Sequence, residues 1–241
     1  RTGCCDMRPV ATRIVVAGGV GCGVGCHGAA RQHSSRAIVM HVVAFNGSAR
    51  AGGNTSILLE HVLAPIRAHG IQTEVLQLGG SDIQPCRACH TCTRTRDGRC
   101  VNDDDVANVF IAKMVAANGI LLGSPSHFAN LTAETKALIA RAGAVARAND
   151  GLFRGKIAAA VIAARRDGEI HAFDAINHFF LTNQMIVPGS CHWNVGVGRE
   201  KGDVTRDEEG LRTMRVLGEN MAWLLQCVAR QPQPSATAAR R

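Results

Sequence analysis

The sequence predicts an α/β fold, a doubly wound five-stranded parallel sheet with helices on both faces. Segments typical of strands alternate with segments typical of helices from about residue 38 onward. The chain has 241 residues, 46% of them hydrophobic and 19% charged, which allows one such domain with a proper core and hardly two. No apolar run reaches the roughly 18 to 20 residues that a membrane helix needs. We therefore expect no membrane-spanning segment and no membrane partner.

The first part of the pattern contains two strands and the helix between them. Residues 38–45 form an uncharged and mostly apolar run, which predicts a buried strand. A helix follows at 55–69, where apolar residues recur at helical spacing and Gly70 ends the helix. Residues 71–78 predict the second strand.

The second part repeats the alternation after a long loop. A helix at 105–117 starts from the aspartates 103–105, which we expect to cap it and otherwise to be solvated. The further elements are a strand at 120–123, a helix at 131–148, a strand at 157–163, a helix at 170–183, a fifth strand region made of 185–188 and 193–197, and a long helix at 207–228. Ligands of such sheets bind beyond the carboxyl ends of the strands, so chemistry is expected in the loops that follow them.

The formal net charge of +8 is concentrated at the two ends of the chain. Residues 1–39 contain five arginines and one acidic residue, residues 230–241 contain three arginines and no acidic residue, and 40–229 carries a net charge of only +1. This distribution argues against a nucleic-acid partner, because a binding groove needs its basic residues on the folded body. We expect 40–229 to be the domain, 230–241 a flexible basic tail, and 1–39 a disordered leader. The leader is either an organelle transit peptide or a mis-assigned start before Met40.

The leader also contains the glycine pattern G-x-G-x-x-G at 23–28. A dinucleotide site needs this pattern between a strand and a real helix, but only about ten polar residues separate it from the next strand. We therefore reject a dinucleotide site at this position.

The loop after the first strand, 46–56, predicts a site for a monophosphate. Its small residues let backbone N–H groups close around an anion at a helix N-terminus, where the positive charge of Arg50 is added. The hydroxyls of Ser48, Thr55 and Ser56 are further donors. The loop lacks the Gly-Lys-Ser/Thr ending that binds nucleoside triphosphates. The alternative interpretation is a plain strand-to-helix turn.

Two further loops are suited to line an aromatic ring system. After the third strand, Pro125 stiffens a turn in which His127 and Phe128 offer flat surfaces. After the fourth strand, the small and polar loop 164–168 faces the same space. The alternatives are an ordinary connection with Phe128 in the core and, for the third loop, a solvated charge run.

Two of these loops together match a known family. The segment Gly47-Ser48-x-Arg50-x-x-Gly53-Asn54-Thr55, followed by Gly123-Ser124-Pro125-x-x-Phe128, resembles the NAD(P)H-dependent FMN reductase family of the flavodoxin-like superfamily. The similarity spans about residues 40–229 and includes 194–200 and 207–210. The resemblance implies a flavodoxin-like fold, a bound FMN, NAD(P)H as co-substrate, and a homodimer or higher homo-oligomer.

The resemblance also assigns residues to the flavin. It implies that the FMN phosphate is bound by Ser48, Arg50, Asn54, Thr55 and Ser56, and that the isoalloxazine is contacted by Pro125, Ser126, His127 and Phe128; the third loop adds Ala164 and Arg165. Many relatives have Tyr or Trp in the second loop and a Gly-Gly pair after the fourth strand, where this chain has His127-Phe128 and Arg165-Arg166. An arginine at that position favours a reduced, anionic flavin.

A cysteine cluster lies in the loop 86–100. Cys86, Cys89 and Cys92 follow one another at C-x2-C spacing, and Cys100 comes seven residues after them. Such a set supplies the four thiolates of a [4Fe–4S] cluster, whereas tetrahedral zinc usually takes two separated pairs. The pattern resembles the iron–sulfur flavoprotein branch of the same family; zinc, and cysteines without a ligand, stay open as alternatives. Because the loop follows a strand at the carboxyl edge of the sheet, we expect it near the flavin.

Together these observations predict an FMN-dependent oxidoreductase in which the flavin carries the chemistry and no catalytic side chain is required. Electrons come from NAD(P)H or a ferredoxin-like electron donor and leave, through the [4Fe–4S] cluster or directly, to a small-molecule electron acceptor. The alternatives are a flavin-only NAD(P)H:quinone or flavin reductase, a non-enzymatic electron-carrier flavoprotein, and a zinc-stabilised module that touches nucleic acid. The thiolates favour a reducing cytoplasm, and the basic leader leaves an organelle open.

Overall fold

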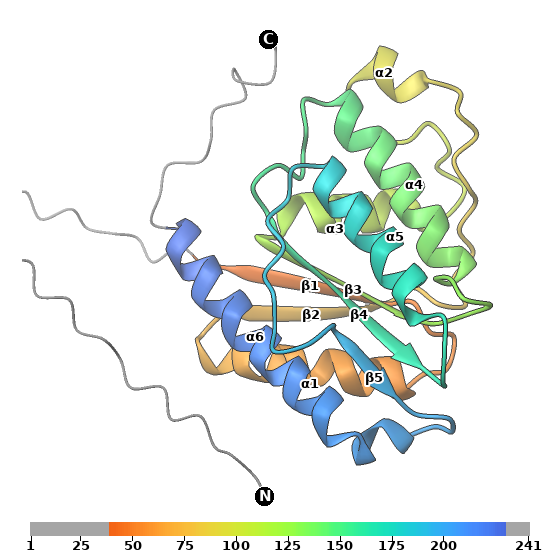
Figure 1. Cartoon of the computed structure of the whole chain (residues 1–241). Helices are drawn as coiled ribbons and strands as arrows, with labels where there is room; N and C mark the ends of the chain where they lie inside the picture. The colour runs from red at the N-terminus through yellow and green to blue at the C-terminus, as the bar shows by residue number, and fades with distance from the viewer. Residues whose placement is uncertain (1–38, 230–241) are drawn as a thin grey trace, which may run out of the picture. The chain divides into compact units, whose positions relative to one another are not determined.

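A computed structural model of the chain describes residues 39–229 (Figure 1). The predictions for the leader and the tail, including the glycine pattern at 23–28, concern residues outside this range. Within it, no helix is both long enough and apolar enough to cross a membrane.

The centre of the fold is one five-stranded sheet in which all neighbouring strands are parallel, in the order β2-β1-β3-β4-β5. The strands are β1 (His41–Asn46), β2 (Gln72–Gln77), β3 (Gly119–Pro125), β4 (Ile157–Ala164) and β5 (Val195–Val197). This confirms the predicted doubly wound sheet. After β1 the chain moves to one side to form β2 and then returns to form β3 on the other side of β1. A crevice for ligands therefore opens between the carboxyl ends of β1 and β3.

Helices cover both faces of the sheet, as Figure 1 shows. The helices are α1 (Asn54–Ala68), α2 (Thr91–Thr95), α3 (Ala107–Ala116), α4 (Ala133–Ala148), α5 (Glu169–Thr182) and α6 (Glu208–Ala229), with a 3-10 turn at Asp203–Arg206. Helices α1 and α6 pack on one face, and α3, α4 and α5 pack on the other. Successive residues of β1 alternate between the two cores: Val42 faces α1 and α6, and Val43 faces the opposite layer.

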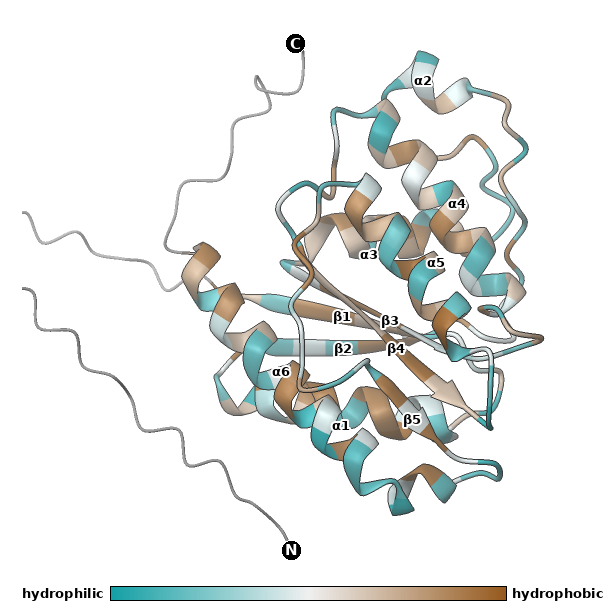
Figure 2. Ribbon diagram, in the orientation of Figure 1, coloured by the Kyte–Doolittle hydropathy of each residue, from teal (hydrophilic) through white to brown (hydrophobic). Residues whose placement is uncertain are grey.

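The helices are amphipathic, because each rests on the sheet with one side only. In α6, Met214, Leu217 and Met221 are fully buried at helical spacing, and Figure 2 shows the hydrophobic and hydrophilic bands that this spacing produces. Helix α1 ends where predicted: Gly70 has a φ of 76°, and its N–H donates to the carbonyl oxygen of Arg67.

Two details differ from the sequence-based expectation. The fifth strand is formed by Val195–Val197 alone, and the 185–188 part of that region contributes only an isolated bridge between Ile186 and Ile157. Pro188 has no N–H for a ladder hydrogen bond, so pairing cannot continue there. The short helix α2 was not predicted, because its five residues have no buried side chain and hence no hydrophobic periodicity.

Candidate functional site

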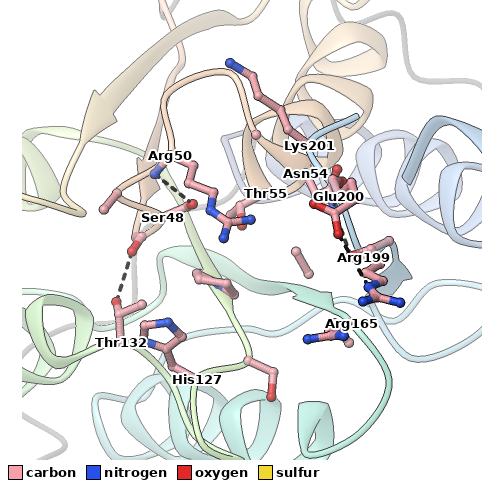
Figure 3. A pocket seen from close by; sticks show the side chains of 18 of the residues that line it. Ser48, Arg50, Asn54, Thr55, His127, Thr132, Arg165, Arg199, Glu200 and Lys201 are labelled. Atoms are coloured by element: carbon pink, nitrogen blue, oxygen red, sulfur yellow. Dashed lines mark hydrogen bonds and ion pairs between the residues drawn. The ribbon is translucent and has the colours of Figure 1, made fainter. Parts of the chain in front are cut away.

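A cavity of about 370 Å³ lies at the carboxyl ends of β1, β3 and β4, a volume suited to a single small-molecule ligand (Figure 3). It is lined by Gly47, Ser48, Ala49, Arg50, Gly53, Asn54, Thr55, Pro125, Ser126, His127, Thr132, Glu134, Ala163, Ala164, Arg165, Gly198, Arg199, Glu200 and Lys201. The three loops selected from the sequence thus meet around one cavity. Of the residues assigned to the flavin, Ser56 and Phe128 do not line it.

The loop after β1 is held in shape by its own hydrogen bonds. The backbone N–H of Ser48 donates to the Asn46 side chain at 3.2 Å, and the N–H of Arg50 donates to the Ser48 hydroxyl at 3.2 Å. Gly79 packs directly beneath the loop, where a Cβ atom would approach the carbonyl carbon of Ser48 to 2.3 Å. Only glycine allows the two backbones to come this close. The loop is therefore preformed.

Free backbone donors gather at the start of α1. The first backbone hydrogen bond of the helix runs from Ile57 N–H to Gly53 C=O, so the N–H groups of residues 54–56 have no partner among the described residues. Arg50 points into the cavity beside Thr55 (Figure 3), and within residues 39–229 its guanidinium makes no ion pair. Unpaired N–H groups, a helix dipole and a guanidinium together form an anion site that fits a phosphate.

The side chain of Asn54 holds the loop that follows β5. Its side-chain Nδ2 donates to the carbonyl oxygens of Gly198 (3.0 Å) and Glu200 (2.9 Å), and its Oδ1 accepts the N–H of Gly202 at 2.8 Å. Both amide protons are therefore in use. Direct contact of this side chain with a phosphate stays a prediction; its observed partners make it a support for the cavity wall.

The opposite wall consists of the turn after β3 and the loop after β4. Ser126 donates its hydroxyl to the carbonyl oxygen of Asp167 at 3.2 Å, and the turn closes through paired backbone hydrogen bonds between His127 and Asn130. Phe128 sits at the tip with a positive φ of 46° and a fully exposed side chain. The alternative that placed Phe128 in the core is therefore wrong.

Some cavity residues were not expected from the sequence. Thr132 donates its hydroxyl to the carbonyl oxygen of Gly47 at 3.0 Å, and the Glu134 carboxylate accepts the N–H of Gly80 at 3.1 Å. Gly198, Arg199, Glu200 and Lys201 arrive from the loop after β5. The rule that points to loops after strands would have found this loop, because the predicted strand region ends at residue 197, where β5 also ends.

The four clustered cysteines are free thiols with different environments. Cys86 and Cys89 are exposed, and Cys92 and Cys100 are half-buried against the core. Hydrogen bonds with the side chain and backbone of Thr91 hold the pKa of the Cys89 thiol below its usual value. Their chemistry suits an iron–sulfur cluster, yet no three His, Cys, Asp or Glu side chains within residues 39–229 gather closely enough to hold a metal. The donor set fits a cluster, but the arrangement of the side chains does not.

The cysteine loop does not line the cavity. The Cys92 thiol lies 3.9 Å from the carbonyl oxygen of Ala144, near the end of α4, whereas the cavity residue Glu134 lies in the first turn of that helix. Ten residues of α-helix correspond to about 15 Å. The expectation that this loop lies beside the flavin site is wrong for Cys92, because the loop leaves the sheet edge and runs along α4 to α2 (Figure 1).

A buried ion pair lies at the base of this loop. Arg141 of α4 pairs with Asp105, and the two side chains are 0% and 1% exposed. We expected the aspartates 103–105 to cap the helix and otherwise to be solvated, and the second expectation is wrong for Asp105, because its carboxylate is buried. The cap is observed, since Asp105 accepts the N–H of Ala107 at 3.0 Å. Burial raises the pKa of Asp105, but hydrogen bonds from Gln84, Ala107 and Arg141 outweigh it and leave the pKa below its usual value.

Comparisons with known proteins identify the family and the fold of this chain. Residues 40–200 match the family described as NADPH-dependent FMN reductase. The chain is 36% identical over 196 residues to an iron–sulfur flavoprotein of Methanocaldococcus jannaschii, which covers 78% of this chain and 99% of that protein. Among solved structures, RosB with bound 8-demethyl-8-formylriboflavin-5′-phosphate has a TM-score of 0.63 at 15% identity, covering 83% of this chain and 84% of RosB.

A flavodoxin from the domain Archaea has a TM-score of 0.51 at 14% identity, covering 78% of this chain and 99% of that one, so the fold is flavodoxin-like. The family match covers residues 40–200, a range that includes the loops after β1, β3 and β4 and the cysteine loop. These comparisons show that the chain belongs to the NADPH-dependent FMN reductase family, in its iron–sulfur flavoprotein branch.

Proposed function

We propose that this protein is an FMN-dependent oxidoreductase whose cavity binds FMN and whose cysteine loop carries a [4Fe–4S] cluster. The observation that carries the proposal is the anion site at the start of α1, which opens into the same cavity as the walls formed by Pro125 to His127 and by Ala164 and Arg165. A phosphate at one end and a flat ring at the other end match FMN. Family membership and the names of the relatives support the same cofactor.

A bound flavin would supply hydride and single-electron transfer. Each part of the cavity would bind or orient a different part of the flavin. The N–H groups of residues 54–56 and Arg50 bind the phosphate, and Asn54 keeps the loop after β5 closed on the cavity. His127 and Arg165 lie on the ring side, where the guanidinium stabilises negative charge on the ring. The chain's own contribution is position and electrostatics, without a side-chain acid or base.

The cluster rests on the chemistry of Cys86, Cys89, Cys92 and Cys100, four free thiols within one short loop. A bound cluster would pass single electrons. In this proposal the electron donor is NAD(P)H or a ferredoxin-like protein, and the acceptor is a small molecule or a redox partner. The protein acts as a homodimer or higher homo-oligomer, and its proposed location is the cytoplasm. A flavin-only reductase and an electron carrier without enzymatic activity are the second candidates, because within residues 39–229 no group of three or more His, Cys, Asp or Glu side chains could hold a metal ion.

The deciding experiment is an anaerobic purification followed by a visible spectrum before and after dithionite. Iron, acid-labile sulfide and released FMN are counted per chain. Flavin bands together with about four irons per chain would support the proposal. Flavin bands without iron would indicate a flavin-only reductase or an electron carrier. A colourless protein that cannot be reconstituted with FMN would contradict the proposal. Steady oxidation of NADH or NADPH by the pure protein separates an enzyme from a carrier.

Replacing Cys89 with Ser is expected to remove most of the iron and to leave FMN binding unchanged, because Cys89 lies on the cysteine loop and lines no part of the cavity. Iron per FMN, measured after anaerobic reconstitution, reports the effect. The matched control is Cys191→Ser, another exposed cysteine that lies outside the loop. Full iron occupancy in Cys89→Ser would show that this residue is not a ligand.

Replacing Asn54 with Ala is expected to weaken FMN binding about tenfold, since three hydrogen bonds to the loop after β5 are lost at once. Most of the change should appear in the dissociation rate, because the loop covers the site. Stopped-flow recovery of FMN fluorescence measures it. Asn220→Ala is the control: it also loses a loop hydrogen bond, to Gly189, away from the cavity. Equal rates for both variants would rule out this role of Asn54.

A further inference from the structure

The loop after β5, residues 198–202, brings a lysine to the end of the cavity where α1 begins. Of the four lysines in the chain, Lys201 is the one that lines the cavity. Its Nζ lies 3.8 Å from the position that a Cβ atom of Gly52 would take, and Gly52 belongs to the loop after β1. Figure 3 shows the lysine side chain extended over the tip of that loop. About 150 positions separate the two residues in the sequence, so the fold alone brings this charge to the anion site.

The backbone that carries Lys201 is held in place on both sides. The side chain of Asn54 donates to the carbonyl oxygen of Glu200 at 2.9 Å and accepts the N–H of Gly202 at 2.8 Å. The turn also closes on itself, because the Asp203 carboxylate accepts the N–H of Glu200 at 2.8 Å, while the Asp203 N–H donates to the carbonyl oxygen of Glu200 at 3.1 Å. Lys201 therefore starts from a fixed point above the loop after β1.

The ammonium group of Lys201 is available to a ligand. Within residues 39–229 the structure gives it no hydrogen bond and no ion pair, and the two acidic side chains that line the cavity have other donors. The Glu200 carboxylate lies 3.4 Å from Nε of Arg199. The Glu134 carboxylate accepts the N–H of Gly80 at 3.1 Å. The flexible four-carbon stem of a lysine then lets the ammonium reach an anion near its fixed backbone.

The charge at this end of the cavity matches a particular class of phosphate. Arg50 supplies one positive charge from the loop after β1, and Lys201 supplies a second from the loop after β5. A phosphate monoester carries a charge of about −1.5 to −2 at pH 7, because its second pKa is about 6. Two cations beside free N–H groups therefore suit a terminal phosphate monoester.

We propose that Lys201 is the second cation of the phosphate site and that its ammonium binds the terminal phosphate monoester of the flavin. The proposal rests on the proposed function, since it takes the ligand of the cavity to be FMN. It adds a binding residue that lies far from the sequence pattern of the loop after β1. It also gives a reason for the hydrogen bonds of Asn54, because they hold the loop that carries this charge.

The test compares Lys201→Gln with Lys136→Gln, the same change at an exposed lysine of α4 that does not line the cavity. The Kd of FMN, measured by quenching of flavin fluorescence, should rise about tenfold in Lys201→Gln and stay unchanged in Lys136→Gln. Lys201→Arg keeps the charge and should restore most of the affinity. The Kd of riboflavin should be the same in all variants. An equal FMN affinity in the two glutamine variants, or an equal loss for riboflavin, would overturn the proposal.

A second measurement needs no substitution. The wild-type protein is treated briefly with acetic anhydride in the presence of FMN or of riboflavin, and acetylation of each lysine is followed by peptide mass spectrometry. FMN should slow the acetylation of Lys201 and riboflavin should not, with Lys136 as the internal reference. Equal rates at Lys201 with the two flavins would contradict the assigned contact. A wild-type protein that binds neither flavin would contradict the proposed function instead, so the two failures are distinguishable.

Discussion

Replacing Arg141 with Met is expected to lower the free energy of unfolding by about 3 to 5 kcal/mol. The guanidinium is fully buried, pairs with Asp105, and donates to the carbonyl oxygens of Gln84 and Asn102. Methionine replaces the apolar stem, but it leaves the Asp105 carboxylate buried without its charge partner. Urea unfolding of the protein, followed by circular dichroism, measures the change.

Two controls separate the burial of the charge from the loss of an arginine. Arg206→Met removes a guanidinium that is 85% exposed beside Asp203, at 3.6 Å, and should cost at most about 1 kcal/mol. Combining Arg141→Met with Asp105→Leu removes both charges and should recover part of the loss, because no unpaired carboxylate stays buried. If Arg141→Met unfolded at the same urea concentration as Arg206→Met, the ion pair would be irrelevant to stability.

The same pair predicts a dependence on pH. The pKa of Asp105 in the folded protein lies below its usual value of 3.8. The stability that its ionised form contributes is therefore fully present above about pH 4 and is lost as the pH falls through the lowered pKa of the folded state. The free energies of unfolding of the wild-type protein and of Asp105→Asn should differ by a constant amount above about pH 5 and converge below about pH 4. A constant difference down to pH 2 would exclude this linkage.

Replacing Arg50 with Ala is expected to raise the Kd of FMN about 10- to 100-fold, because a hydrogen bond to a charged group contributes about 1.5 to 3 kcal/mol. The guanidinium points into the cavity beside Thr55 at the start of α1, where a phosphate would be bound. Quenching of flavin fluorescence on titration of the apoprotein measures the Kd. High salt should weaken binding to the wild-type protein more than binding to the variant.

Riboflavin provides the sharpest control, since it has the ring and the ribityl chain of FMN but no phosphate. Its affinity should be the same for the wild-type protein and for Arg50→Ala. Arg166→Ala is the matched variant, because Arg166 follows the cavity residue Arg165 in the chain but does not line the cavity. An unchanged FMN affinity in Arg50→Ala, or an equal loss for riboflavin, would remove Arg50 from the phosphate site.

Much of the site was predictable because it follows from local rules. Strands and helices alternate with clear periodicity, and parallel strands bring the loops at their carboxyl ends to one edge. Ser48, Arg50 and Thr55 on the first loop therefore meet His127 on the second, although about 75 residues separate them in the chain. Roles set by distant partners were not predictable. Asn54 looks like a phosphate ligand in sequence, and its partners, Gly198 to Gly202, are roughly 145 positions away.

The fold class, the three loops of the cavity and the spacing of the cysteines can be predicted from the amino-acid sequence alone, because periodicity, turn residues and ligand types are properties of short segments. The places of those segments in space depend on how the helices and the sheet pack. That packing buried Asp105 against Arg141, held Cys100 with Asn108, and carried Cys92 along α4 away from the cavity. These outcomes depend on which surfaces exclude water together, and a buried charge or amide must then find its partner wherever the packing brings one.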